Sequence, residues 1–408
     1  MQRRNFLKTA ATATVGAAGL AVIPGTVLAE DTNKAIKYPK QFRVDSYAHF
    51  SSEKVLDFLE DAVRNPKVAG LPPIKGFKHV YRSLFGGVPT IIDPVKRIAL
   101  MEKQGIDMTI IVPTPWIETI PAPYITKEVS LGAAQLMNNE MSALVKKYPK
   151  HFRAVAVLPT LDKDQMIGEF RRAVKELGMV GGTYMCGYSL KRPDHEDYFS
   201  PKADENDNLY AEADRLGVPL WLHPGTSPTK AEYADEENLP FPAPQKMVSK
   251  YQTFQAFTWL SDSTNAMGRI VFAGVFEKHP KLKIVIHHAG ALVPLYKERA
   301  TNGWNFFEQN IGFRYSEKIS KPYAEHYKNF YIDTATQGHT PELLKTAIEF
   351  FGVDKTLFGS DAPMDAESGA IFMGGARSSL EAINLPVEDV RKIYSGNISK
   401  LIGLNIPS

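Results

Sequence analysis

Short apolar runs alternate with amphipathic segments along most of this 408-residue chain, and this alternation restricts the fold more than any other feature. A strand buried in a parallel sheet is a continuous apolar run, and a covering helix has apolar residues about 3.6 positions apart. We interpret eight runs as strands: Phe42–Ser46, Asp107–Pro113, Arg153–Leu158, Met179–Tyr184, Val218–Leu222, Lys283–His287, Asn329–Asp333 and Thr356–Ser360. Eight strand–helix units in sequence predict an α/β protein with a (β/α)8 TIM barrel.

The segments between these runs have helical periodicity. They include Leu131–Lys147, Lys163–Leu177, Leu209–Leu216 and Pro341–Phe351. A doubly wound open sheet would show the same alternation and is the alternative fold. The first predicted strand is not followed by a glycine-rich dinucleotide-binding motif, which favours the barrel.

Two connections are too long to be simple loops between a strand and a helix. Residues 50–95 follow the first predicted strand, and residues 224–262 follow the fifth. Both leave the carboxyl ends of their strands, where barrel enzymes build their binding sites. We therefore predict long loop insertions after strands 1 and 5, which either form walls of a substrate pocket or pack against other protein surfaces.

The first 29 residues have the pattern of a cleavable export signal. Arg3 and Arg4 precede an apolar run rich in Ala and Gly, which ends in small residues. The paired arginines resemble the twin-arginine signal, which exports folded proteins. We therefore expect residues 1–29 to be a signal peptide, residues 30–408 to be one barrel domain, and the mature protein to be periplasmic or otherwise exported.

Charge and composition exclude several other classes of protein. The formal net charge is +3, and the first 29 residues hold three of the cations and no acid, so their removal leaves a neutral protein. A neutral chain without a Lys/Arg tract argues against a nucleic-acid partner. A permanent membrane anchor is disfavoured because Pro24 and Gly25 interrupt an apolar run of small residues. The single cysteine, Cys186, cannot form an internal disulfide.

Four of the predicted strands lead into side chains that can bind a metal ion. The first run continues to His49, the fifth is followed by His223, the sixth leads into His287 and His288, and the eighth leads into Asp361. A lone histidine after an apolar run is more often structural. Because the carboxyl ends of barrel strands meet at one face, however, these side chains are expected to converge. Imidazoles and a carboxylate with one position open for water are a ligand set of catalytic zinc.

Several longer motifs occur in a characteristic order. They are Tyr148–Pro159, Gly178–Gly182, Gly217–Gly225, Phe276–Gly290, Phe350–Pro363 and the closing segment Ile393–Ile398. In this order the motifs resemble the metal-dependent amidohydrolase superfamily. Within it, they resemble the branch of aminocarboxymuconate-semialdehyde decarboxylase and the aromatic-acid decarboxylases. The resemblance covers essentially the whole mature chain.

The resemblance implies roles for particular residues. His49 and His223 would bind the metal, Asp361 would be a ligand and proton carrier, and His288 would be the acid/base. Arg299 matches a family arginine near the substrate and would bind a carboxylate, although a surface ion pair is the alternative. One metal ion is implied, because the fourth predicted strand lacks the lysine that bridges two metals in dinuclear relatives. Zinc is the expected ion, with manganese, iron or cobalt as alternatives.

Tyr47 departs from the family pattern, in which the first strand carries His-x-His or, in the aromatic-acid decarboxylases, Glu-x-His. A phenol has a reference pKa of about 10 and is a poor ligand unless a cation lowers that pKa. Tyr47 could bind as a phenolate, or His49, His223 and Asp361 could bind the metal without it, or the metal could be weak or absent. The second alternative is favoured, because three protein ligands plus water are a common catalytic set.

The implied activity is that of an enzyme acting on a small aromatic or unsaturated carboxylic acid, most simply by non-oxidative decarboxylation. Hydrolysis of a lactone, ester or amide at the same site is the alternative reaction. The protein could instead be no enzyme but a metal-free module that binds a small carboxylate. This alternative is considered because Tyr47 stands where the family has a metal ligand. Family members are often dimers, so the resemblance also implies a homodimer.

Overall fold

The structure is a computed structural model. It describes residues 38–68, 70–73, 75, 88–113, 124, 126–159, 161–185, 205–224, 254–314 and 317–406. The expected signal peptide, residues 1–29, lies outside the described residues, as do residues 69, 74 and 76–87 of the predicted insertion at 50–95 and residues 225–253 of the one at 224–262. All elements named below belong to one compact unit, Lys37–Ser408.

The strands form two sheets in which all neighbouring strands are parallel. One sheet has the order β1 (Val44–Phe50), β2 (Met108–Pro113) and β3 (Phe152–Ala154). The other has the order β4 (Ala156–Val157), β5 (Gly182–Met185), β6 (Leu220–His223), β7 (Ile284–Ile286), β8 (Tyr331–Asp333) and β9 (Thr356–Leu357). The predicted α/β class is therefore confirmed.

Hydrogen bonds between main-chain atoms join the two sheets at both junctions. Between β3 and β4, Val155 N donates to Ile111 O of β2 at 3.0 Å, so β3 and β4 are one strand interrupted at Val155. After β9, Ala362 O accepts from His49 N of β1 at 2.7 Å. The strands thus close into the eight-membered parallel barrel that the sequence predicted.

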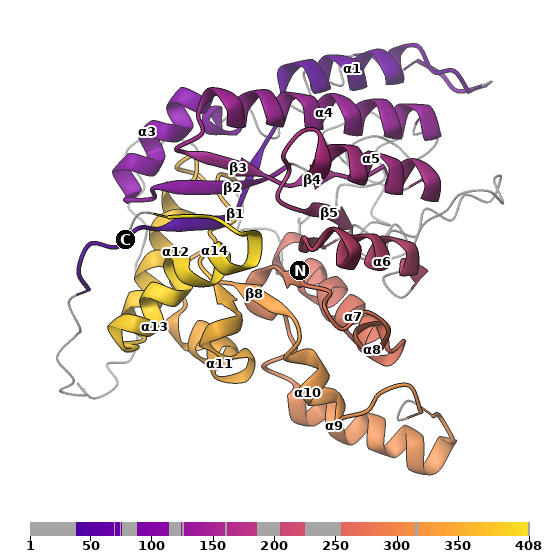
Figure 1. Cartoon of the computed structure of the whole chain (residues 1–408), viewed down its shortest axis with the longest axis vertical. Coiled ribbons are helices and arrows are strands. Elements are labelled where there is room, and N and C mark those ends of the chain that lie inside the picture. The colour runs from indigo at the N-terminus through magenta and orange to yellow at the C-terminus, as the bar shows by residue number, and fades with distance from the viewer. Residues whose placement is uncertain are drawn as a thin grey trace, which may run out of the picture. The chain divides into compact units, whose positions relative to one another are not determined.

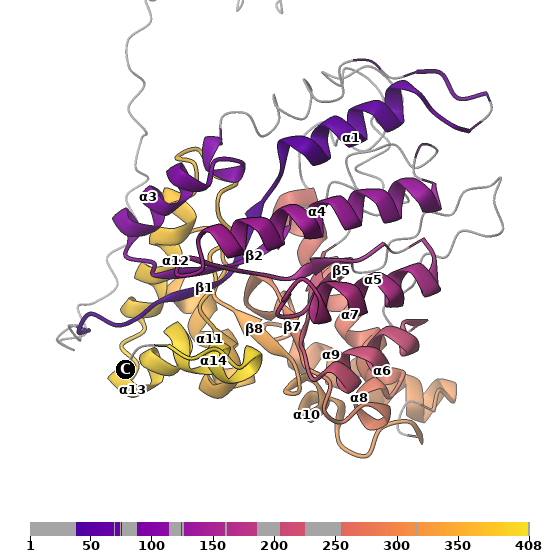
Figure 2. The same cartoon turned by 45° about the horizontal axis from the view of Figure 1, so that its top comes forward.

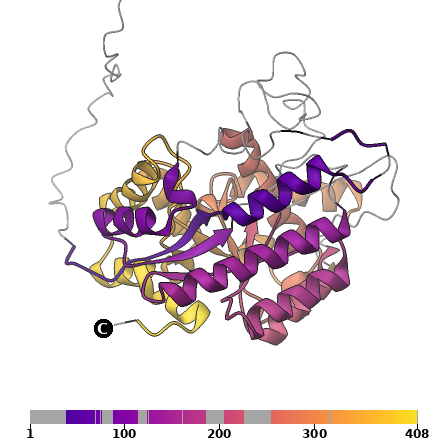
Figure 3. The same ribbon diagram turned by 90° about the horizontal axis from the view of Figure 1, so that it is seen from above.

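Helices cover the outer face of the strands, and α1, α4, α5 and α6 follow one another around the barrel (Figures 1 and 3). The helices are α1 (Glu53–Arg64), α3 (Pro94–Gln104), α4 (Lys127–Lys147), α5 (Lys163–Lys175), α6 (Asp207–Leu216), α7 (Trp259–Phe272), α8 (Val275–Lys278), α9 (Lys297–Phe306), α10 (Tyr323–Tyr327), α11 (Pro341–Phe351), α12 (Ala370–Ala382), α13 (Val387–Arg391) and α14 (Asn397–Ile402). The prediction for α11 is confirmed at both ends, and those for α4, α5 and α6 differ by two to four residues at one end. Among the described residues, none of the helices combines the length and apolarity that a bilayer span requires.

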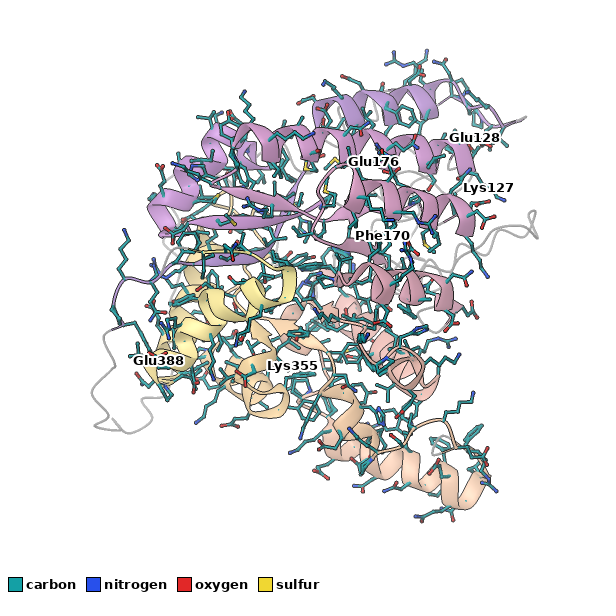
Figure 4. The ribbon with its side chains drawn as sticks, viewed as in Figure 1. Lys127, Glu128, Phe170, Glu176, Lys355 and Glu388 are labelled. Carbon is teal, nitrogen blue, oxygen red and sulfur yellow. The ribbon has the colours of Figure 1, made fainter. Side chains whose placement is uncertain are left out.

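The helices bury one face against the strands. In α5, the buried Phe170 ring lies against β5, where a Cβ added at Gly182 would be 2.9 Å from the ring. A larger residue than glycine at that position would therefore push α5 away from the barrel. Lys127 and Glu128, at the start of α4, lie by contrast at the outer edge of the molecule (Figure 4).

Helix α9 and the turn after it, η8 (Phe307–Ile311), bury none of their side chains. In two views α9 and α10 lie at the lower edge, away from α1 and α4 (Figures 1 and 2). The large apolar side chains exposed in this region are Leu295, Tyr296, Phe306, Phe307, Ile311 and Phe313. Helix α9 therefore contributes no fully buried side chain to the barrel core, and its partly buried Trp304 packs against that core.

Candidate metal centre

The side chains predicted from the strand ends meet around Asp361. His49 lies in β1, His223 ends β6, and His288 begins the short turn after β7. All four side chains are buried. Asp361 Oδ1 lies 3.2 Å from His49 Nε2, and its Oδ2 lies 3.4 Å from His288 Nε2. The centroids of the His49 and His223 rings are 5.4 Å apart.

Main-chain carbonyl groups set the tautomers of the two predicted histidine ligands. His49 Nδ1 is 3.1 Å from Val112 O, and His223 Nδ1 is 2.6 Å from Pro224 O. Since a carbonyl only accepts, each Nδ1 carries a proton. His49 Nε2 faces both the Tyr47 hydroxyl group and Asp361 Oδ1. Burial, followed by the nearby His49 and His287 rings, holds the pKa of His223 well below its usual value. His223 is therefore a neutral imidazole in the tautomer that a metal ion requires.

Tyr47 lies directly beside these ligands. Its hydroxyl oxygen is 3.2 Å from His49 Nε2, the nitrogen that also lies 3.2 Å from Asp361 Oδ1. The Tyr47 ring stacks on the His287 ring, with centroids 3.3 Å apart and planes 15° apart. In this arrangement the phenol contacts the nitrogen of His49 that a metal ion would use.

The donor set fits a divalent ion in its chemistry, and one pair of donors also fits in its spacing. Two ligands about 2.1 Å from one ion are about 3.0 Å apart at a right angle and about 3.4 Å apart at a tetrahedral angle. The 3.2 Å between His49 Nε2 and Asp361 Oδ1 lies in that range. No three His, Cys, Asp or Glu side chains in the described part of the chain are gathered as closely as a bound ion requires. An ion bound to this pair would therefore have to draw His223 closer.

Asp361 and His288 form a buried pair of opposite charges. Burial raises the pKa of Asp361, but hydrogen bonds from His288 and His49 outweigh it and hold that pKa well below its usual value. Burial lowers the pKa of His288, but the hydrogen bond to Asp361 and its charge outweigh it and raise that pKa. His288 Nδ1 is buried and has no hydrogen-bond partner among the described residues. It is thus placed to give a proton to a bound molecule.

Asp333 and Gln337 contact the cluster and were missed by the sequence analysis, which also gave His287 no role of its own. His287 Nδ1 lies 2.8 Å from Asp333 Oδ2, and both side chains are wholly buried. Burial raises the pKa of Asp333 to about 7 and holds that of His287 well below its usual value. Gln337 Nε2 donates to Asp361 Oδ2 at 2.7 Å. Asp333 could have been identified from the sequence, because it ends a predicted strand and the candidate ligands also lie at strand ends. No feature of the sequence indicated Gln337.

Arg299 is not brought to this cluster. Its side chain is exposed on α9, and it forms no hydrogen bond or ion pair with any residue that the structure describes. Its expected role as a carboxylate-binding residue stays a prediction.

A cavity of about 750 Å³ lies between α7, α9 and α10. Its walls include the aromatic side chains of Phe272, Trp304, Tyr323 and Tyr327. None of the residues around Asp361 lines it, so this cavity is separate from the candidate metal centre.

Comparison with known proteins identifies relatives along nearly the whole barrel. The chain is 26% identical over 313 residues to the gamma-resorcylate decarboxylase of Polaromonas sp. strain JS666, covering 76% of this chain and 87% of that protein. It is 23% identical over 318 residues to the 2-amino-3-carboxymuconate-6-semialdehyde decarboxylase of Dictyostelium discoideum, covering 77% of each protein.

A solved structure with the same fold contains a metal ion. It is the dihydroxybenzoic acid decarboxylase of Polaromonas sp. JS666 with bound manganese and the inhibitor 2-nitroresorcinol. It superposes with a TM-score of 0.64 at 22% identity, covering 90% of this chain and 98% of that one. The model of the amidohydrolase family matches residues 44–404, from β1 to the last helix. This chain therefore belongs to the amidohydrolase family.

Proposed function

We propose that this protein is a metal-dependent carboxy-lyase that removes CO₂ from a small aromatic carboxylic acid without oxidation. The observation that carries the proposal is the buried His288–Asp361 pair next to His49 and His223. It combines a proton donor with metal-binding atoms at one barrel face, which is where barrel enzymes place their chemistry. The names of the two relatives described above support decarboxylation over hydrolysis.

His49, His223 and Asp361 would hold the ion. Two of these residues contribute neutral imidazole and the third a carboxylate, a set that several divalent ions accept. Zinc was expected from the sequence, and the manganese in the related structure makes manganese the stronger candidate. A bound divalent ion would polarise and orient the carboxylate and a neighbouring oxygen of the substrate.

His288 would supply the proton that decarboxylation requires. In this reaction the bond between the ring carbon and CO₂ breaks, its electron pair stays on the ring carbon, and a proton is added there. His288 Nδ1 has no partner among the described residues, and Asp361 stabilises the protonated ring from its other side. Gln337 fixes Asp361 through the bond to Oδ2. These residues therefore hold a proton beside the site at neutral pH.

We expect the full chain to release CO₂ from at least one hydroxylated benzoic acid. The first candidates are 2,6-dihydroxybenzoate and 6-methylsalicylate, the acids after which two similar decarboxylases are named. Chelation should abolish the release, and added Mn²⁺ or Zn²⁺ should restore it, because the ion orients the carboxylate. Product analysis by chromatography, with CO₂ measured in parallel, is the test. CO₂ release that survives complete chelation would contradict the metal-dependent mechanism, and turnover of a lactone alone would favour the hydrolytic alternative.

We expect Tyr47→Phe to tighten metal binding about fivefold, since it removes one hydrogen bond, worth about 1 kcal/mol, that competes for His49 Nε2. The affinity for Mn²⁺, measured by competition with a chromophoric chelator, is the readout. Tyr184→Phe is the matched control, because it removes a buried phenol that contacts Tyr210, away from the cluster. Weaker binding in Tyr47→Phe would instead identify Tyr47 as a phenolate ligand.

A further inference from the structure

We infer that Asp45 is a positioning residue that sets the separation of His49 and Asp361, acting through Ser360. Asp45 lies four residues before His49 in β1, and Ser360 immediately precedes Asp361. The inference rests on the proposed metal centre, in which His49 and Asp361 are both ligands. It concerns residues that touch neither the ion nor the substrate.

The Asp45 carboxylate binds the segment that carries Asp361. Asp45 is wholly buried, and its Oδ1 accepts from Ser360 N at 3.0 Å and from Tyr47 N at 3.2 Å. Its Oδ2 accepts from the Ser360 hydroxyl group. The same hydroxyl oxygen accepts from Ala362 N at 3.1 Å. One carboxylate thus connects β1 to the residues on both sides of Asp361.

The main chain of the two ligands is fixed by the same junction. Asp361 N donates to Tyr47 O at 2.9 Å, and His49 N donates to Ala362 O at 2.7 Å. Asp361 has a φ of 65°, in the left-handed region that is uncommon for residues other than glycine. Such a conformation persists only where surrounding contacts hold it, and the Asp45–Ser360 contacts are adjacent to it.

Arg97 of α3 holds His49 from the opposite side. Its Nη2 donates to His49 O at 2.6 Å and its Nε donates to Thr90 O at 3.0 Å, although the side chain is only 1% exposed. Its charge is opposite to that of Asp45, which partly offsets the lowering of the Arg97 pKa by burial. The peptide groups on both sides of the His49 side chain are therefore fixed. The 3.2 Å between His49 Nε2 and Asp361 Oδ1 follows from these contacts.

The test measures metal affinity in Asp45→Asn and Ser360→Ala. Asp45→Asn keeps the shape of the side chain and removes its charge, and Ser360→Ala removes the hydroxyl that bridges Asp45 and Ala362 N. We expect each variant to bind Mn²⁺ about 10- to 100-fold more weakly, as when other residues that orient metal ligands are changed. Excess Mn²⁺ should restore the turnover number of Ser360→Ala, since its ligands and His288 remain.

Asn138→Ala is the matched control. Asn138 is also wholly buried and bonds to the main chain of Val157 and to Glu169, away from the cluster. It should lower the melting temperature without changing Mn²⁺ affinity. If Asp45→Asn and Ser360→Ala bind Mn²⁺ as tightly as Asn138→Ala does, the positioning role is wrong while the metal centre stands. A wild-type protein that binds no divalent ion would overturn the metal centre itself, and the positioning role with it.

Discussion

The His288→Asn variant is expected to lose about 10²- to 10⁴-fold in kcat, the usual contribution of a positioned acid or base. The change removes the imidazole whose buried Nδ1 has no hydrogen-bond partner among the described residues and whose Nε2 contacts Asp361. Asparagine is chosen because His288 has a φ of 58°, which asparagine tolerates better than most residues. Steady-state kinetics on an accepted acid gives kcat and KM, and mass spectrometry gives the metal content.

Metal content should stay at the wild-type level, because His288 is not among the proposed ligands. His339→Asn is the matched control. His339 is on the surface, bonds only to Ser378 among the described residues, and should give wild-type rates. Full turnover by His288→Asn would contradict the proposed role of His288 as the proton donor. If the wild type turns the acid over while His288→Asn binds it without turnover, the protein is an enzyme and not a binding module.

The Asp361→Asn variant should lose both metal and activity. The carboxylate contacts His49, His288 and Gln337 at once, so its charge serves the ion and the proton donor together. Loss of a direct ligand should weaken Mn²⁺ binding by at least about 100-fold, the upper range for residues that only orient ligands. Without the negative charge His288 also loses its main source of a raised pKa. Turnover should therefore stay low even in excess Mn²⁺.

Asp354→Asn is the matched control for this variant. Asp354 is exposed and pairs with Lys392 on the surface, where an ion pair contributes about 0 to 1 kcal/mol. It should bind Mn²⁺ and turn over substrate as the wild type does. If Asp361→Asn bound as much metal as the wild type, the Asp361 carboxylate would not be a ligand of the ion.

The barrel could be predicted from the sequence because local patterns specify each of its strand–helix units. The prediction of Pro341–Phe351 as a helix is confirmed at both ends, since a proline begins it and a glycine follows it. Strand limits were less accurate. β1 continues to Phe50 rather than ending at Ser46, because it pairs with β2 as far as Phe50 and Pro113, and His49 N also donates to Ala362 O.

The interruption at Val155 was equally invisible in the sequence. The run Arg153–Leu158 is uniformly apolar after its first residue, so nothing in it indicates a change of partner. The strand changes its pairing partner at Val155. The residues before Val155 pair with β2, and those after it pair with β5.

The convergence of His49, His223, His288 and Asp361 was predicted from the sequence alone, because parallel strands of a barrel place their carboxyl ends at one face. Tyr47 was recognised as a departure, but its consequence was not. Only the tertiary structure shows that its hydroxyl group binds His49 Nε2 and that its ring stacks on His287.

The sequence by itself determined which residue types stand at the strand ends, and hence the family and the class of chemistry. The tertiary structure decided which of those residues touch. Asp333 and Gln337 join the cluster, and Asp45 reaches Ser360, 315 positions away, because barrel closure sets the last strand segment beside the first. Arg299, which matched a family motif, lies exposed on α9 instead. Local patterns fix each strand and its end, whereas contacts between distant strands depend on how the barrel closes, which no local pattern encodes.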